Sequence, residues 1–141
     1  YVAQTFVKKM LEQKRAGSFV FLSSMAGKRG EAGASAYCAS KFGLIGMVQS
    51  FAAEVAVNNI RVNAICPGNV NTPMLRKVAE DIASNTGKNT DEVWQEMANI
   101  AAAERLVEPE EIAQTCLWLC SPGASAITGE AINVDAGALS G

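Results

Sequence analysis

Three side chains of the sequence have the types and the spacing for acid–base chemistry: Ser24, Tyr37 and Lys41. Tyr37 and Lys41 are four residues apart, so on a helix the phenol and the ammonium group lie on one face. A nearby cation favours the phenolate form of a tyrosine. The pair therefore has the chemistry of a general acid and base near neutral pH, with the Ser24 hydroxyl just upstream.

The segments around these residues predict a strand, a helix and a second strand. Residues 18–23 form a short, continuous apolar run, which is typical of a parallel strand buried on both faces. After a glycine-containing loop, Ser35 is expected to cap a helix that runs to about residue 57. Residues 60–66 form the next apolar run, so the three segments predict a βαβ unit with two parallel strands.

The ends of the two predicted strands carry the polar and turn-forming residues. Ser24 follows the first strand, and Pro67 and Gly68 end the second. In open α/β sheets, ligands bind at the carboxyl ends of the strands. We therefore expect Ser24 and the Pro-Gly pair to lie at the same edge of the sheet, in a binding site.

Residues 72–107 predict a pair of helices inserted after the second strand. Thr72 is placed to cap the first helix and Gly87 to end it. The second helix begins near Asn89, and its predicted apolar side consists of Val93, Trp94, Met97 and Ile100. The pair is either a solvated helical surface or a lid that covers the substrate, and the sequence leaves both open.

The remaining segments predict two helices and one strand. Residues 1 to about 15 have the wide apolar stripe of an amphipathic helix. Residues 108–120 predict a further helix, with proline and acids in its first turn, and residues 131–135 predict a short final strand. The residues expected to be buried on that helix are Ile112, Thr115, Cys116, Trp118 and Leu119.

The central helix, over residues 36–57, is unusually rich in alanine, serine and glycine. Small side chains allow another backbone to approach closely, which permits two interpretations. The helix packs against the sheet, or it forms a subunit interface in a homo-oligomer. Phe42, Ile45, Gln49 and Phe51 lie on other faces of the same helix and also need cover, which favours a dimer or tetramer.

Composition and charge exclude several classes of protein. The chain has 141 residues, 49% of them apolar, which is enough for one globular domain. The net charge is −2 and there is no run of lysine and arginine, so the sequence lacks the basic patch that would bind nucleic acid or an anionic membrane. No apolar run reaches the roughly 18 residues of a membrane span, and the first residues do not resemble a signal peptide, so we expect a cytoplasmic protein.

Acidic residues are concentrated in the inserted helices and the start of the helix that comes after them. An anionic ligand bound there would need positive charge nearby. The basic residues that are available for this are Arg76, Lys77, Lys88 and Arg105.

Histidine is absent and the four cysteines form no CxxC motif. A catalytic triad that depends on histidine is therefore excluded within this chain, and no metal site is expected. We expect the cysteines to be buried, reduced thiols.

Taken in sequence order, these motifs resemble the carboxyl-terminal half of a short-chain dehydrogenase/reductase. The family has a serine at a strand end and, thirteen positions later, a Tyr-x-x-x-Lys motif, and Ser24, Tyr37 and Lys41 match it. Further segments that resemble the family's strands and its Pro-Gly loop are residues 60–63, 67–72 and 128–135. The resemblance implies an α/β fold: the carboxyl-terminal half of a doubly wound, Rossmann-like parallel sheet with a helical insertion over the substrate.

The resemblance also implies a reaction, the reversible hydride transfer between NAD or NADP and a small-molecule alcohol or carbonyl substrate. Tyr37 would donate or accept the proton, Lys41 would support Tyr37 and bind the nicotinamide ribose, and Ser24 would orient the reacting oxygen. The implied cofactor-binding residues are Tyr37, Lys41, Pro67, Gly68, Val70 and Thr72.

The sequence departs from the family in what it lacks. The glycine-rich phosphate loop has no counterpart, because Gly27, Gly30 and Gly33 follow the wrong strand and lack the GxGxxG form. The family's catalytic asparagine would precede Tyr1. We therefore expect residues 1–141 to form one partial Rossmann-type domain without its phosphate-binding half, inactive alone. The alternative is a non-catalytic or truncated relative that acts as a binding or assembly module.

Overall fold

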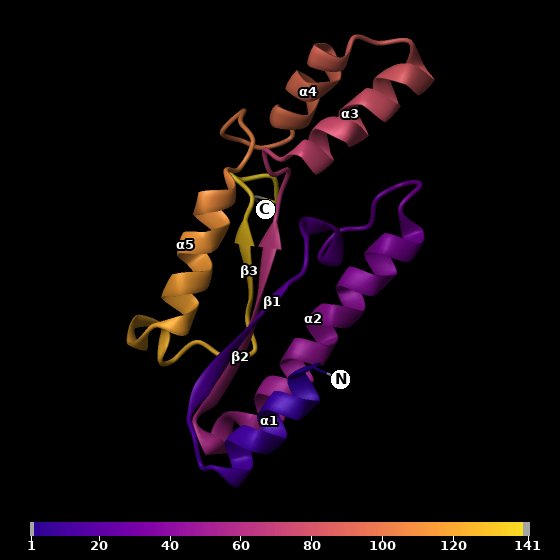
Figure 1. Cartoon of the computed structure of the whole chain (residues 1–141). Coiled ribbons are helices and arrows are strands. Elements are labelled where there is room, and N and C mark those ends of the chain that lie inside the picture. The colour runs from indigo at the N-terminus through magenta and orange to yellow at the C-terminus, as the bar shows by residue number, and fades with distance from the viewer. Residues whose placement is uncertain (1, 140–141) are drawn as a thin grey trace.

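Three parallel strands form one sheet in the order β1–β2–β3 in the computed structural model, which describes residues 2–139 (Figure 1). The strands are β1 (Gly17–Leu22), β2 (Ile60–Pro67) and β3 (Ala131–Val134). Gly17 of β1 is paired with Ile60, and Ala64 of β2 is paired with Ala131. The predicted apolar runs and the parallel βαβ unit are confirmed.

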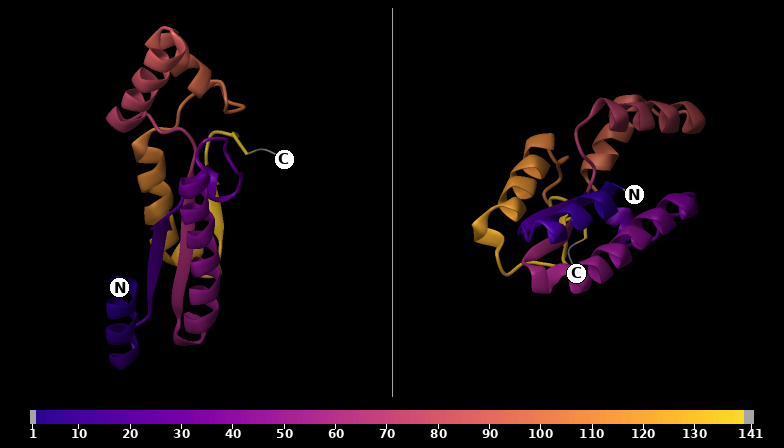
Figure 2. Two further views of the ribbon diagram at one scale, coloured as in Figure 1. Left: turned by 90° about the vertical axis from the view of Figure 1, so that its right-hand side faces the viewer. Right: turned by 60° about the horizontal axis from the view of Figure 1, so that its bottom comes forward.

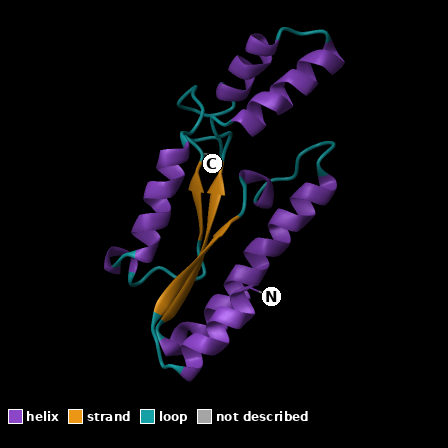
Figure 3. Ribbon diagram, in the orientation of Figure 1, coloured by secondary structure: helices purple, strands orange, loops and turns teal. Residues whose placement is uncertain are grey.

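Helices cover both faces of this sheet (Figure 3). The helices α1 (Val2–Glu12) and α2 (Ser35–Val55) pack on one face, where Val48 and Ala52 of α2 meet Val62 and Ala64 of β2. The helix α5 (Pro109–Cys120) packs on the other face, and its Leu119 is buried against Ile65. Because helices occupy both faces, the central strand β2 is almost wholly buried, as its apolar sequence predicts.

Two inserted helices, α3 (Pro73–Thr86) and α4 (Thr90–Ala98), project beyond the carboxyl ends of the strands (Figures 1 and 2). The Thr72 hydroxyl accepts a hydrogen bond from the Leu75 backbone N–H at 3.2 Å, and Gly87 ends α3 with φ of 73°. Val93, Trp94 and Met97 pack against α3 as expected. Ile100 does not, because α4 ends at Ala98 and Ile100 lies exposed in the following turn.

Four further expectations about local structure need correction. Ser35 is the first residue of α2 and not its cap; Ala34 holds the cap position, without a side-chain hydrogen bond. The helix ends at Val55, and a short 3₁₀ turn, η2 (Ala56–Asn58), carries the chain to the strand. Trp118 is exposed because the apolar side of α5 faces the sheet through Leu119. Cys120 is also exposed, whereas Cys38 and Cys66 are buried.

Three more expectations concern the start of the first helix, membrane-spanning helices and metal ions. The expected helix start at Tyr1 lies outside the described residues. No helix within residues 2–139 has the length and apolar character to cross a membrane. Over the same range, no group of three or more cysteine, aspartate and glutamate side chains is placed to hold a metal ion.

Candidate active site

Ser24 lies where β1 ends and the short 3₁₀ helix η1 (Met25–Gly27) begins. The Ser23 backbone N–H still donates to the Ile65 carbonyl at 2.8 Å, as in the sheet. Ser24 then leaves the strand, and its hydroxyl caps η1 by accepting from the Ala26 N–H at 3.2 Å. The cap fixes the hydroxyl at the carboxyl edge of the sheet, where the sequence predicts it.

Tyr37 and Lys41 lie side by side on the first turns of α2. The Lys41 Nζ is 5.6 Å from the centroid of the Tyr37 ring, and it donates a hydrogen bond to the Leu22 carbonyl at 3.1 Å. The hydrogen bond holds the ammonium group at the end of β1, next to the phenol. The Tyr37 side chain is 49% exposed, so its hydroxyl is accessible to a ligand.

Ser23 and Gly27 hold the start of α2 against the end of β1. The buried Ser23 hydroxyl donates to the Lys41 carbonyl at 3.1 Å. A Cβ at Gly27 would lie 2.6 Å from the Ser23 Oγ and 2.8 Å from the Lys41 carbonyl oxygen, so only glycine permits this approach. Neither role is evident from the sequence alone, where the only signal is a pair of adjacent serines and the glycine that ends the Ser-Met-Ala-Gly turn.

Burial governs the chemistry of the Cys66 thiol at the end of β2. Burial raises the pKa of the Cys66 thiol, and the positive charge of Lys28 and a hydrogen bond with Ser23 only partly oppose this effect. Cys66 therefore stays a neutral thiol, which is a poor nucleophile. Its role is to pack behind Ser23, consistent with the expectation of a buried, reduced cysteine.

The Pro-Gly loop follows β2 at the same edge of the sheet. The Gly68 N–H donates to the Val134 carbonyl at 3.1 Å, and a Cβ at Gly68 would lie 2.9 Å from the Asp135 Cα. Val70 forms an isolated parallel bridge with Val107, in which the Asn71 N–H donates to the Val107 carbonyl at 2.8 Å. The loop is therefore fixed between β3 and the segment that leads into α5.

One cleft, with a cavity volume of about 770 Å³, brings most of the predicted residues together. Ser24 and Tyr37 contribute to it from two different elements, and the loop contributes Pro67, Gly68, Val70 and Thr72. Lys41 does not line the cleft; it lies behind Tyr37. The lining residues that the sequence did not assign to a site include Glu31, Met74, Leu75, Val78, Pro109 and Ile112.

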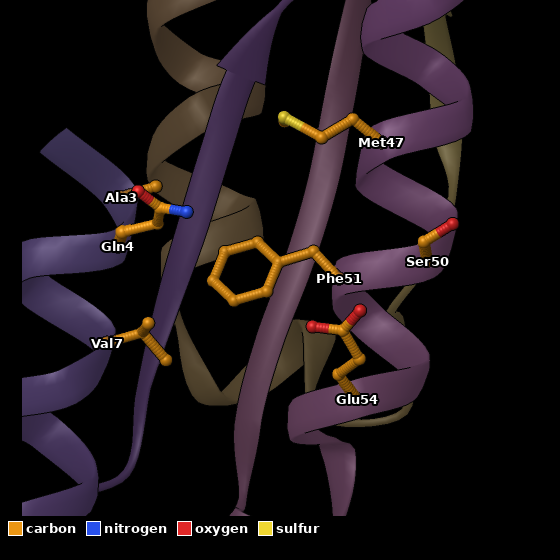
Figure 4. A pocket seen from close by; sticks show the side chains of 7 residues that line it. All are labelled: Ala3, Gln4, Val7, Met47, Ser50, Phe51 and Glu54. Carbon is orange, nitrogen blue, oxygen red and sulfur yellow. The ribbon is translucent and has the colours of Figure 1, made fainter. Parts of the chain in front are cut away.

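A second hollow, of about 490 Å³, lies between α1 and α2 and contains none of the predicted site residues. The residues that line it are Ala3, Gln4 and Val7 of α1 and Met47, Ser50, Phe51 and Glu54 of α2, and Figure 4 shows the Met47 and Phe51 side chains extending toward α1. We assign no part of the proposed chemistry to this hollow, because Ser24, Tyr37 and the Pro-Gly loop do not line it.

Known proteins resemble this chain in sequence and in fold. A family model described as enoyl-(acyl carrier protein) reductase matches residues 1–138. The chain belongs to the short-chain dehydrogenase/reductase family. It is 40% identical over 136 residues to the 3-oxoacyl-(acyl-carrier-protein) reductase of Thermotoga maritima, a match that covers 96% of this chain and 50% of the relative.

Solved structures of the short-chain dehydrogenase/reductase family confirm the predicted fold class. The actinorhodin polyketide ketoreductase with NADPH has a TM-score of 0.87 and 36% identity, over 94% of this chain and 50% of that one. The 4-hydroxyisoleucine dehydrogenase complexed with NADH has a TM-score of 0.79 and 28% identity, over 99% of this chain and 54% of that one. The chain thus spans about half the length of the relatives it matches.

Proposed function

We propose that the chain is the carboxyl-terminal half of an NAD(P)-dependent oxidoreductase that interconverts a secondary alcohol and a carbonyl compound. The full-length enzyme of this proposal is the longer polypeptide that also has a phosphate-binding half before Tyr1. The observation that supports the proposal most strongly is that Ser24, at the start of η1, and Tyr37, on α2, line one cleft together with the Pro-Gly loop. Such convergence of polar groups in an otherwise apolar cleft is typical of an active site.

Each of the three polar residues has a proposed role. Tyr37 donates a proton to the carbonyl oxygen during reduction and accepts one from the alcohol during oxidation. Lys41, with its Nζ 5.6 Å from the phenol ring, stabilises the negative charge that the phenol develops. Ser24 donates a hydrogen bond to the reacting oxygen and fixes its position.

The residues at the carboxyl edge fit the nicotinamide end of NAD or NADP. Gly68 brings the loop backbone close to β3, and the loop then lines the cleft through Pro67, Val70 and Thr72. When bound, the nicotinamide ring gives or takes up the hydride. The loop would hold the ring against the cleft, and Lys41 would bind the ribose beside it.

The chain also presents a surface suited to a second copy of itself. Phe42 and Met47 of α2 are 46% and 41% exposed, and a Cβ at the neighbouring Gly43 or Gly46 would meet nothing within 4 Å. The glycines of α2 therefore do not pack against the sheet, which favours the interface interpretation of this helix. We infer a homo-oligomer, a dimer or tetramer, that assembles through α2.

The substitution Tyr37→Phe in the full-length enzyme tests the proposed reaction. It removes the proton donor but keeps the ring, so kcat should fall by roughly 10²–10⁴-fold while binding of NADH or NADPH is retained. The measurement is the steady-state oxidation of the reduced cofactor by ketones, with cofactor binding followed by fluorescence.

Near-wild-type turnover of Tyr37→Phe would contradict the assignment. Cofactor binding without turnover in the unaltered full-length enzyme would instead support the alternative, a non-catalytic binding module.

A further inference from the structure

The cleft that holds Ser24 and Tyr37 contains a single charged side chain, that of Glu31. Glu31 lies in the loop between η1 and α2, where its backbone carbonyl accepts from the Ala34 N–H at 3.1 Å. Its side chain is partly buried. Within residues 2–139, no hydrogen bond or ion pair engages its carboxylate. A carboxylate that lines a cleft without a partner is available to a ligand.

The basic residues that an anionic ligand would need are already paired. The sequence offers four such residues, and in the structure each one contacts an acid on the insertion or at the start of α5. The pairs are Arg76–Asp91 at 2.6 Å, Lys77–Asp81 at 3.1 Å, Lys88–Glu96 at 2.6 Å and Arg105–Glu111 at 2.7 Å. None of these four basic residues lines the cleft.

The three basic residues nearest in sequence to the site are also outside the cleft wall. The Lys28 ammonium donates to the Ala131 carbonyl of β3, and the Lys41 ammonium donates to the Leu22 carbonyl. Arg29 is exposed and does not line the cleft. The described part of the chain therefore supplies the cleft wall with one negative charge and no positive charge.

The rest of the wall strengthens the effect of that charge. Met74, Leu75 and Val78 of α3 and Pro109 and Ile112 of α5 are apolar, so a substrate that fills the cleft replaces water along this part of its wall. Charges interact more strongly where water is excluded, so a second negative charge near Glu31 is strongly disfavoured. A hydrogen-bond donor near Glu31 is favoured, because it offsets the desolvation of the carboxylate.

We propose that Glu31 selects the substrate: it accepts a hydrogen bond from a second hydroxyl group of an uncharged alcohol or ketone, and it rejects substrates with a carboxylate or phosphate group near the reacting carbon. This inference rests on the proposed function, since it concerns the same cleft. Glu31 is a specificity-determining residue and takes no part in proton transfer.

The test compares three four-carbon secondary alcohols that differ in one substituent: a vicinal diol, the plain alcohol and the hydroxy carboxylate. The variants of the full-length enzyme are Glu31→Gln, which keeps an acceptor oxygen but removes the charge, and Glu31→Leu, which removes both. Glu130→Gln is the matched control, because Glu130 is exposed and does not line the cleft. Two quantities are measured: kcat/KM, and equilibrium binding to the cofactor-loaded protein by saturation-transfer NMR, which needs no turnover.

The wild type should prefer the diol over the hydroxy carboxylate in both measurements. Glu31→Gln should raise kcat/KM and affinity for the hydroxy carboxylate by about 10-fold, because the repulsion is gone. Glu31→Leu should lower both for the diol by about 10-fold, the usual effect of losing a hydrogen bond to a charged group. The plain alcohol should change by less than about 2-fold, and the control should match the wild type.

Equal effects of the Glu31 variants on all three alcohols, or tight binding of the hydroxy carboxylate by the wild type, would overturn the inference. The experiment distinguishes failure of the proposed reaction from failure of the proposed role of Glu31. If no alcohol is turned over but the binding preference shifts in Glu31→Gln as stated, the inference on Glu31 stands and the proposed reaction is wrong.

Discussion

At the scale of single residues, the proposed chemistry depends on distances that a few neighbours maintain. Ser24 and Tyr37 come from different elements, and the Ser23 hydroxyl and the absence of a side chain at Gly27 hold those elements together. The sequence predicts Ser24, Tyr37 and Lys41 by their spacing alone. It does not predict Ser23 or Gly27, because their roles arise from contacts between segments that only the folded chain brings together. It does not predict Glu31 either, because the place of Glu31 in the cleft wall depends on the fold.

The substitution Gly27→Ala tests this support. The added methyl group would collide with the Ser23 Oγ and the Lys41 carbonyl, so it should push η1 from α2 and destabilise the full-length enzyme by about 1–3 kcal/mol. It should also lower kcat/KM, because Ser24 moves relative to Tyr37. Thermal unfolding and steady-state kinetics measure the two effects.

Gly30→Ala is the matched control in the same loop, since a Cβ there meets nothing within 4 Å. It should leave both stability and kcat/KM nearly unchanged. Equal behaviour of the two alanine variants would show that the close approach at Gly27 has no role in the site.

At the scale of elements, capping residues determine where the helices that carry the site begin. Thr72 and Gly87 bound α3 as the sequence predicts, because both caps depend on the local chain. The sequence places the start of α2 one residue late, since Ser35 can form a cap but Ala34 holds that position. The exposure of Trp118 escapes sequence analysis because it depends on how α5 is oriented against the sheet, and that of Ile100 because α4 ends at Ala98.

The start of α5 gives a prediction of pH dependence. Glu111 accepts hydrogen bonds from Arg105 and from the Glu108 N–H, and these lower its pKa from 4.5 to about 2. A lowered pKa in the folded state means that the charged form stabilises the fold above pH 4.5, and that this stabilisation is lost as the pH falls toward 2. Glu111→Gln should therefore lower the stability at pH 7, by less than about 1 kcal/mol because the pair is partly exposed.

Thermal unfolding at a series of pH values from 7 to 2 measures the difference in stability between wild type and Glu111→Gln. The gap in stability between wild type and Glu111→Gln should narrow as the pH falls toward 2, where about half of the wild-type Glu111 carboxyl groups are protonated. Glu110→Gln, one position earlier and without a partner among the described residues, should show no such convergence. A gap that is constant with pH would refute the role of the Arg105 pair.

At the scale of the whole molecule, α2 serves two proposed purposes. Its first turns carry Tyr37 and Lys41, and its exposed apolar side chains and open glycines suit an interface between copies. The sequence left packing on the sheet and subunit contact open, because small residues suit both. In the structure Ala52 packs on the sheet, whereas Gly43 and Gly46 face open space, which supports the proposed contact between copies.

The double substitution Phe42→Glu and Met47→Glu tests the interface. The two substitutions place negative charges on both sides of the helix face that carries Gly43 and Gly46. They should convert the full-length enzyme from a dimer or tetramer to a monomer in sedimentation equilibrium, because an unpaired charge is costly to bury. Val57→Glu, an equally apolar-to-acidic change at an exposed site beyond the helix, should keep the wild-type mass. An unchanged mass of the double variant would exclude α2 as the interface.

The central claim is that Ser24 and Tyr37 act on one substrate oxygen as a unit, and a double-mutant cycle of kcat tests it most directly. Groups that act as a unit lose their effect together, so Ser24→Ala should cost little once Tyr37→Phe is present. We predict that the double variant turns over within about 3-fold of Tyr37→Phe alone. Losses that multiply independently, or a double variant with wild-type turnover, would contradict the account.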